Sequence, residues 1–241
     1  MNYPQEQKAA VDAAITSRRS IRAFLPTPVE RATVEEILEV AARAPSGTNT
    51  QPWRVYVLTG EAKTTLSQKI IQAYDDPVHR AEHTEEYAYY PTRWSSPFIE
   101  RRRKVGWDLY ALLGIDKSDK AGMHAQHRRN YKFFDAPVGL IFTIDRIMCQ
   151  GSWLDYGMFL QSVMVSARAR RLDTCPQAAF TPFHRIITEH LALPENEQVV
   201  CGMSLGYADP KAVENRLVTE RAPLSEFARF VDRSPSAPPA P

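Results

Sequence analysis

The sequence predicts an α+β or α/β domain in which helices cover a sheet of few strands. Segments with helical spacing outnumber those with strand character, and long connections separate the strands. The chain of 241 residues also contains neither a GxGxxG fingerprint nor a GxxxxGK(S/T) loop. Dinucleotide binding by a Rossmann unit and P-loop chemistry therefore have no support in this sequence.

The first part of the chain predicts helices over 6–18, from Thr33 onward and over 61–74. The second of these opens with Thr-Val-Glu-Glu, a capping-box pattern in which the first and last side chains satisfy free backbone N–H groups. Before the third helix, WRVYVLTG alternates apolar and polar residues from Trp53, which predicts a strand.

The later part of the chain predicts two strands and two helices. The run 138–144 (VGLIFTI) is almost wholly apolar, which indicates a buried strand. Residues 152–172 have apolar side chains around most of the helical circumference, so we expect a buried central helix that Ser152 could cap. A shorter helix over 184–192 and a strand over 198–208 complete the pattern.

Residues 75–136 differ from the rest because many aromatic and basic residues gather there. We interpret this segment as a helical insertion, whose aromatic residues either form a substrate pocket or simply fill the core and a subunit interface. Arg101, Arg102 and Arg103 could meet an anionic substituent of a substrate. No linker interrupts the chain, so we predict one domain over 1–233 and a disordered Pro-rich tail over 234–241.

Charge and cysteine content limit the classes of partner. Lys plus Arg is 30 and Asp plus Glu is 28, a balance that gives no support for nucleic-acid or membrane binding. We expect no transmembrane segment and no secretion signal. Three widely spaced cysteines suit reduced thiols in the cytoplasm, and neither they nor the six histidines have metal-ligand spacing.

Residues 17–22 (SRRSIR) concentrate positive charge beside hydroxyls. If the chain is extended there, Arg18, Ser20 and Arg22 point to one side, while Arg19 points to the other. Two guanidinium groups flanking a hydroxyl suit a phosphate dianion, because charge-assisted bidentate hydrogen bonds are strong. A basic helix end that interacts with its own dipole is the alternative interpretation.

The stretch 44–53 (APSGTNTQPW) places hydroxyl and amide side chains between two prolines, just before a strand. Such a loop offers many donors and acceptors on a stiff frame, which suits the polar edge of a heterocycle. A simple turn with a proline stop is the alternative.

Together, SRRSIRAF and AARAPSGTNTQPWRVYV resemble the FMN-dependent nitroreductase family. The segments SWLDYGMFLQSVMVSARARRLDTCPQAAF and VVCGMSLGYADPKAVENRLVTERAPL are similar to its central helix, the loop after it and its closing region. The resemblance covers about residues 10–230. It implies an α+β fold with a mixed sheet flanked by helices, and an intertwined homodimer with two FMN molecules at the subunit interface.

The resemblance also implies which residues bind the cofactor. Those matching the flavin phosphate and ribityl contacts are Arg18, Arg19, Ser20, Arg22 and Arg221. Those matching the loop that reaches the partner's flavin are Pro45, Ser46, Gly47, Asn49 and Gln51. Those matching the loop beside the flavin N5–O4 edge are Pro176, Gln177, Ala178 and Ala179. Ala178-Ala179 and Arg170-Arg171 depart from the family's usual Glu-Gly and Leu-Gly.

We therefore expect ping-pong chemistry on FMN N5, with NADH or NADPH as the reductant and a small aromatic, commonly a nitroaromatic such as a nitrobenzoate, as the oxidant. No protein side chain is predicted to be catalytic. Alternatives within the fold are a dehalogenase, an enone reductase or a flavin-fragmenting enzyme. A flavin-binding or nucleic-acid-binding protein without turnover is an alternative of another class.

Overall fold

The computed structural model describes residues 4–232, so the predicted tail over 234–241 lies outside the described residues. The α-helices are α1 (Gln5–Ser17), α2 (Arg31–Ala41), α3 (Gly60–Asp75), α4 (Pro77–Glu82), α5 (Phe98–Leu112), α6 (Lys120–Arg128), α7 (Gln150–Ala169), α8 (His184–Leu191) and α9 (Leu224–Phe227). The strands are β1 (Trp53–Leu58), β2 (Val138–Asp145), β3 (Asp173–Gln177) and β4 (Glu197–Gly206). The 3-10 segments are η1 (Gly47–Asn49), η2 (Arg129–Asp135), η3 (Ala178–Phe183) and η4 (Val213–Arg216).

The strands form one sheet in the order β1-β2-β4-β3, and each neighbouring pair is antiparallel. The predicted α+β class is confirmed, but the expected mixed sheet is wrong for these strands. Parallel pairing is confined to an isolated bridge between Ser20 and Thr174. The segment around Ser20 makes too few ladder bonds to count as a strand, so it adds no parallel neighbour to the sheet.

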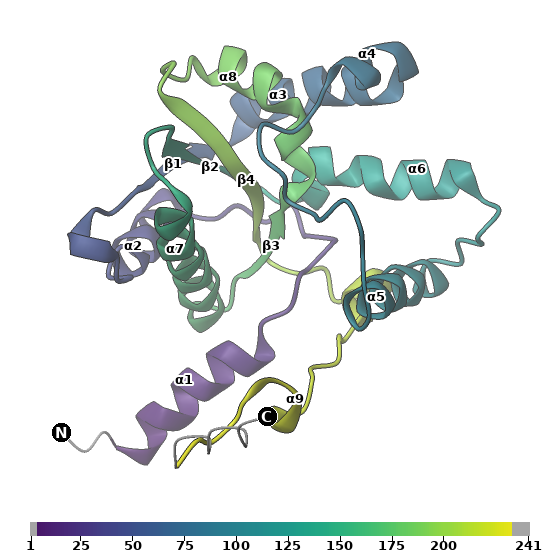
Figure 1. Ribbon diagram of the computed structural model, residues 1–241. Helices are drawn as coiled ribbons and strands as arrows, with labels where there is room; N and C mark the ends of the chain where they lie inside the picture. The colour runs from purple at the N-terminus through teal and green to yellow at the C-terminus, as the bar shows by residue number, and fades with distance from the viewer. Residues whose placement is uncertain (1–3, 233–241) are drawn as a thin grey trace, which may run out of the picture.

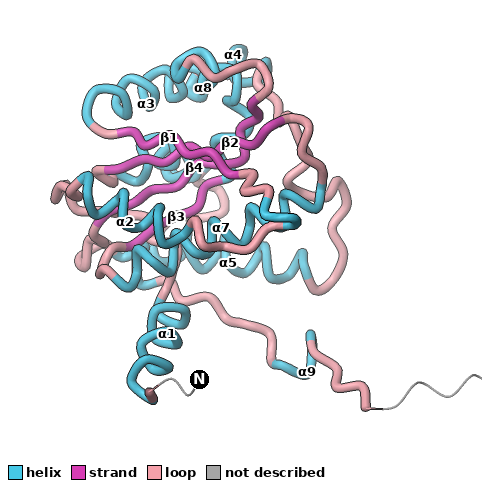
Figure 2. Tube along the Cα trace, turned by 90° about the vertical axis from the view of Figure 1, so that its left-hand side faces the viewer, coloured by secondary structure: helices cyan, strands magenta, loops and turns pink. Residues whose placement is uncertain are grey.

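Helices cover both faces of the sheet, and each face has its own apolar core (Figures 1 and 2). On one side α3 and α8 pack over Ile141 of β2; on the other, α2 and α7 pack over Leu140 and Phe142. Side chains of a strand alternate between faces, and both faces are covered here. This explains why β2 is apolar along nearly its whole length.

The two predicted helix caps are wrong. Helix α2 begins at Arg31, so Thr33 lies inside its first turn, and Glu30 at the N-cap makes no side-chain capping bond. Helix α7 begins at Gln150, and the Ser152 hydroxyl contacts Met148 Sδ at 3.5 Å instead of capping a backbone N–H. In both cases the chain turns helical two residues before the capping pattern begins.

The segment 75–136 divides into a buried end and an exposed arm. Its last aromatic residues, Tyr131, Phe133 and Phe134, are buried core residues, as one of the two interpretations expected. Helix α5 has no buried residue and lies apart from the sheet (Figure 1).

A buried carboxylate ties the sheet together. Glu197 is only 3% exposed, and it accepts hydrogen bonds from Arg54 Nη1 at 2.7 Å, Tyr56 Oη at 2.9 Å and Thr143 Oγ1 at 2.5 Å. Burial raises the pKa of Glu197, but these donors outweigh it and hold the pKa below its usual value. The charge is thus retained inside the fold.

None of the helices within residues 4–232 is long and apolar enough to cross a membrane.

Candidate functional site

A pocket of about 720 Å³ lies where the end of α1 meets α7 and the segment 217–221. It contains the predicted phosphate ligands Arg18, Arg19, Ser20, Arg22 and Arg221. The other lining residues are Ile15, Thr16, Ser17, Gln161, Arg168, Leu217, Val218 and Thr219. Residues from both ends of the sequence, about two hundred positions apart, therefore meet in one place.

The predicted alternation of the basic hexapeptide is observed in part, because Arg19, expected to point away, also lines the pocket. Helix α1 ends at Ser17, Arg18 takes extended backbone angles, and the Ile21 N–H donates to Thr174 O at 3.1 Å. Ile21 is buried, whereas Arg18, Ser20 and Arg22 are half-buried along the pocket. The prediction of an extended backbone after Ser17 is therefore confirmed, in preference to the alternative in which these residues form the basic end of a helix.

Positive charge in this pocket is not neutralised from within. Five of its lining residues are arginines, and the thirteen lining residues include no carboxylate. Burial lowers the pKa of Arg18, and repulsion from Arg221 lowers it further, although an arginine stays protonated. Such a set of guanidinium groups would be stabilised by a bound anion.

Arg168 belongs to this pocket but escaped the sequence-based prediction. It lies in the last turn of α7, donates from Nε to Ser17 Oγ at 2.9 Å, and pairs from Nη1 with Asp173 Oδ1 at 3.2 Å. Arginine is common in the last turn of helices, so the sequence carried no signal for a site. Its ion pair with Asp173 fixes its place and leaves the other arginines to carry the excess charge.

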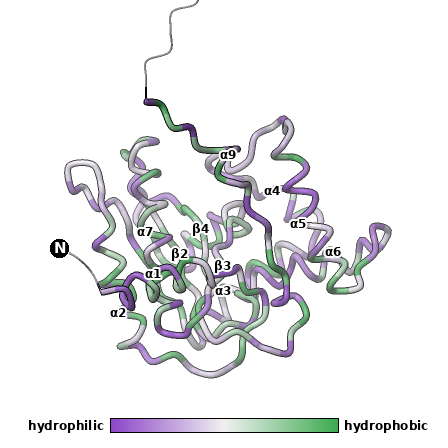
Figure 3. Tube along the Cα trace, turned by 90° about the horizontal axis from the view of Figure 1, so that it is seen from below, coloured by the Kyte–Doolittle hydropathy of each residue, from purple (hydrophilic) through white to green (hydrophobic). Residues whose placement is uncertain are grey.

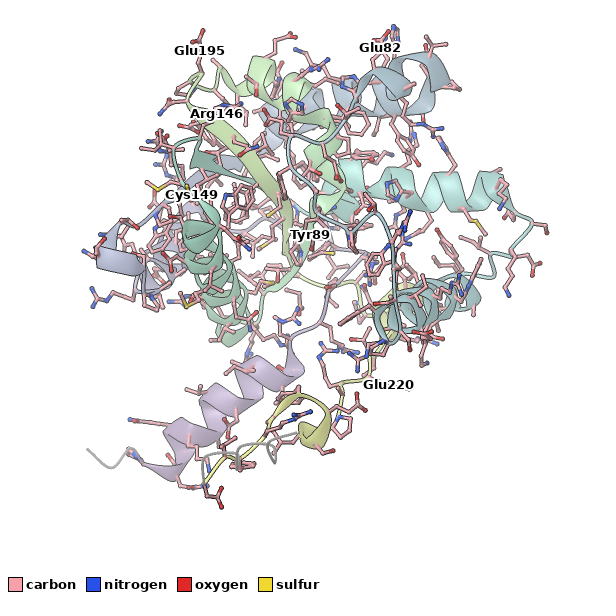
Figure 4. All side chains as sticks on the ribbon, viewed as in Figure 1. Glu82, Tyr89, Arg146, Cys149, Glu195 and Glu220 are labelled. Carbon is pink, nitrogen blue, oxygen red and sulfur yellow. The ribbon has the colours of Figure 1, made fainter. Side chains whose placement is uncertain are left out.

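Arg221 reaches the pocket from an irregular segment near the C-terminal end. Its Nη1 donates to Thr219 Oγ1 at 2.7 Å and to Glu220 O at 2.9 Å. These bonds fold the side chain back on its own segment. Figure 4 labels the neighbouring Glu220 where this segment passes below α5.

The stretch predicted as a loop beside the flavin is partly a strand. Pro176 and Gln177 end β3, while Ala178 and Ala179 open η3 and are half-buried. The Gln177 side chain is only 3% exposed; it accepts from Ser204 Oγ at 2.7 Å and donates to Asn130 O at 2.8 Å. Its amide is thus engaged in the core and does not point to a ligand.

The loop 45–51 lies away from the arginine pocket. The Gly47 N–H donates to Asp155 Oδ2 at 3.0 Å, and the Gln51 N–H donates to Ser46 Oγ at 3.0 Å. Thr48, Asn49 and Gln51 have φ between 48° and 61°, in the left-handed region. These bonds hold a strained, exposed loop in place at the N-terminal end of α7.

Within one chain, the loop residues 45–51 do not line the pocket. The helical rise places Arg168 about 20 Å from Asp155 along α7, and Gln161, which also lines the pocket, about 9 Å from it. The structure therefore brings together the predicted phosphate ligands but not the predicted loop ligands Pro45, Ser46, Gly47, Asn49 and Gln51.

The nitroreductase family model matches residues 15–207. The chain belongs to the nitroreductase family. It is 46% identical over 91% of its length to a 4-nitrobenzoate reductase of Pseudomonas putida, of which it covers 95%. It is 41% identical over 92% of its length to a chloronitrobenzene nitroreductase of Comamonas testosteroni, of which it covers 96%.

A solved structure has the same fold over nearly its whole length. The FMN and NADPH-dependent nitroreductase NfnB from Sphigopyxis sp. strain HMH superposes with a TM-score of 0.88 at 38% identity. The match covers 92% of this chain and 99% of that one. The arrangement of helices around the sheet is therefore that of a nitroreductase.

The two buried thiols are not expected to take part in the redox chemistry of this family. Cys175 lies beside the arginine segment, yet burial raises its pKa to about 11, and burial raises the pKa of Cys201 to about 12. Both are therefore neutral thiols near pH 7.

Among residues 4–232, no three His, Cys, Asp or Glu side chains gather where they could hold a metal ion.

Proposed function

We propose that this protein is an FMN-dependent NAD(P)H oxidoreductase that reduces small nitroaromatic compounds. The observation that carries the proposal is the pocket of five arginines without a carboxylate, four of them at positions where the family resemblance implies flavin-phosphate ligands. Family membership and the activities named for the relatives support the same reaction.

The residues present fit a flavin phosphate. Arg18, Arg22 and Arg221 would bind its oxygens, and the Ser20 hydroxyl would donate between them. The main chain of Ala178 and Ala179 would flank the isoalloxazine ring, as the resemblance implies. FMN, when bound, supplies the hydride and electron transfer between NAD(P)H and the nitro group. The protein's own part is to hold the cofactor and admit substrates.

We infer further that the chain acts as an intertwined homodimer. The loop around Gly47 is about 20 Å along α7 from Arg168 in the arginine pocket of its own chain, so a second subunit would supply it. Large apolar side chains are also exposed on the segments that would meet that subunit. They are Val11, Ile15, Leu154, Met158, Phe227, Phe230 and Val231. The C-terminal segment that carries three of them projects from the body (Figures 2 and 3).

The dimer is tested by mass in solution. The parent should elute at about twice the chain mass of 27.3 kDa in multi-angle light scattering. Leu154→Asp with Met158→Asp should shift it toward one chain mass and weaken FMN retention. A parent that is monomeric at micromolar concentration, yet holds FMN, would overturn this inference.

The reaction is tested under anaerobic conditions in a stopped-flow spectrometer. The purified protein should be yellow, NADPH or NADH should bleach it, and a nitroaromatic should restore the colour. Restoration by a halophenol or an enone, but not by a nitro compound, would favour a dehalogenase or enone reductase. A flavin that neither dinucleotide bleaches would indicate a flavin-binding protein without turnover.

The free cysteines suit a reducing compartment, so we infer that the enzyme is cytoplasmic.

A further inference from the structure

The Arg102 guanidinium on α5 lies against two neighbouring aromatic rings. Its guanidinium carbon lies 5.6 Å from the centroid of Tyr90 and 5.0 Å from that of Trp94. The two rings are themselves 5.5 Å apart. Stacking of this kind restricts a flexible arginine and leaves the edge of its fork, with its N–H donors, free to bind an anion.

Within the described chain Arg102 has no acidic partner, unlike Arg101 and Lys104. It differs from the equally unpaired Arg103 in stacking on aromatic rings. Arg101 pairs with Glu226 at 2.7 Å, and Lys104 pairs with Asp108 at 2.8 Å. Among residues 4–232, no carboxylate oxygen lies within ion-pair distance of Arg102. Its charge is therefore available to a ligand.

The aromatic residues around Arg102 continue towards the end of β3. Tyr89 packs edge-on against Tyr90, with ring centroids 4.6 Å apart. Burial raises the pKa of Tyr89, and its neighbours Tyr90 and Cys201 raise it further, which places the phenol beside β4. Figure 4 shows Tyr89 near the centre of the molecule, in front of the region where β4 meets β3.

The register of the sheet completes this path. Cys201 precedes Gly202, which pairs with Gln177, and Ala178 follows directly in the chain. Tyr89, Tyr90 and Trp94 therefore form a row of ring contacts that leads from the neighbourhood of β4 to the guanidinium group of Arg102 on α5. The stretch that carries them is anchored, because the Tyr87 hydroxyl donates to Val200 O and Glu86 pairs with Arg146 at 2.8 Å.

We propose that Arg102 binds the carboxylate of the substrate and selects nitroarenes with an anionic substituent over neutral ones, while Tyr89 and Tyr90 stack on the aromatic ring. This inference rests on the proposed function. It answers a question that family membership leaves open, since relatives of 46% and 41% identity are named for a nitrobenzoate and for a neutral chloronitrobenzene.

The test compares 4-nitrobenzoate with 4-nitrobenzamide, which has nearly the same shape but no charge. Arg102→Gln should lower the ratio of kcat/KM for the acid to kcat/KM for the amide by about ten-fold, the effect of one charge-assisted contact. Arg103→Gln is the matched control because it removes the same charge one residue further along α5. It should change that ratio less than two-fold.

A binding measurement separates this effect from chemistry. Unreactive benzoate should perturb the flavin absorbance of the oxidised parent, and Arg102→Gln should weaken that binding by a similar factor. Equal losses for acid and amide, or an Arg103→Gln effect as large as that of Arg102→Gln, would overturn the role of Arg102. A parent that reduces neither compound would overturn the proposed function as well, so the two failures are distinguishable.

Discussion

The arginine pocket makes a quantitative prediction about cofactor affinity. Arg18 is half-buried, and burial together with repulsion from Arg221 lowers its pKa, so the pocket without an anion holds like charges close together. Replacing Arg18 or Arg221 by glutamine removes one charged donor and keeps a polar side chain of comparable reach. We expect FMN to bind more weakly in each variant, while the cofactor-free fold keeps its stability or gains some.

The magnitude follows from the kind of hydrogen bond that each substitution removes. A hydrogen bond to a charged group contributes about 1.5–3 kcal/mol, which corresponds to about ten- to a hundred-fold in Kd. Arg221 is solvent-exposed, so its contribution belongs at the lower end of that range. Because both side chains would contact one phosphate, the double variant should lose less than the product of the two single effects.

The assay is titration of the apoprotein with FMN and with riboflavin, followed by flavin fluorescence at two salt concentrations. The parent should prefer FMN, whereas the double variant should show a much smaller preference over riboflavin and respond less to salt. Arg31→Gln is the control because Arg31 is exposed on α2 and lies outside the pocket. A double variant that holds FMN as tightly as the parent, with the same preference over riboflavin, would refute the anchoring role.

Three further predictions concern single residues. Exposed Cys149 should be the one thiol per chain that a disulfide reagent titrates in the native protein, against three after denaturation. Arg171→Gly should raise the unfolding free energy by about 1 kcal/mol in urea titrations, since Arg171 has a φ of 61°. Glu197→Gln should lower it by about 1–3 kcal/mol at pH 7. The Glu197 pKa is depressed by folding, so its contribution is present above the unfolded pKa of about 4.3 and lost as pH falls through the folded value. The parent should therefore lose stability more steeply than the variant on acidification.

The sequence predicted the elements whose burial is nearly uniform. Strand β2 is covered on both faces, so an apolar run marked it. The bounds of helix α7 were also predicted within a few residues, but the expectation that it is buried is wrong on its outer side, where Leu154 is 72% exposed. Apart from Arg19, the basic hexapeptide was also predicted correctly, because the alternation of Arg18, Ser20 and Arg22 needs only an extended backbone.

Strand β3 could not be predicted from its own residues. It is a five-residue edge strand that contains Pro176, and proline is tolerated there because an edge needs fewer backbone donors. Its strand character comes from pairing with β4, which is a tertiary effect. The contacts of Arg168 and Asp155 could not be predicted from local sequence either, because their partners, Ser17 and Gly47, lie over a hundred positions away in the chain.

Helix α7 explains why two groups of predicted ligands can be separated in one chain and still serve one site. Asp155 fixes the loop at one end and Arg168 borders the pocket at the other, on a rigid rod. Leu154 and Met158 lie one turn apart on its outer face and are 72% and 37% exposed. If that face packs against its own copy about a two-fold axis perpendicular to the helix, the two helices run antiparallel. Each N-terminal end then lies beside the partner's C-terminal end, and the loop of one subunit faces the arginine pocket of the other. Given the ligand roles that the resemblance implies, the separation within a chain is therefore a geometric reason to expect dimerisation.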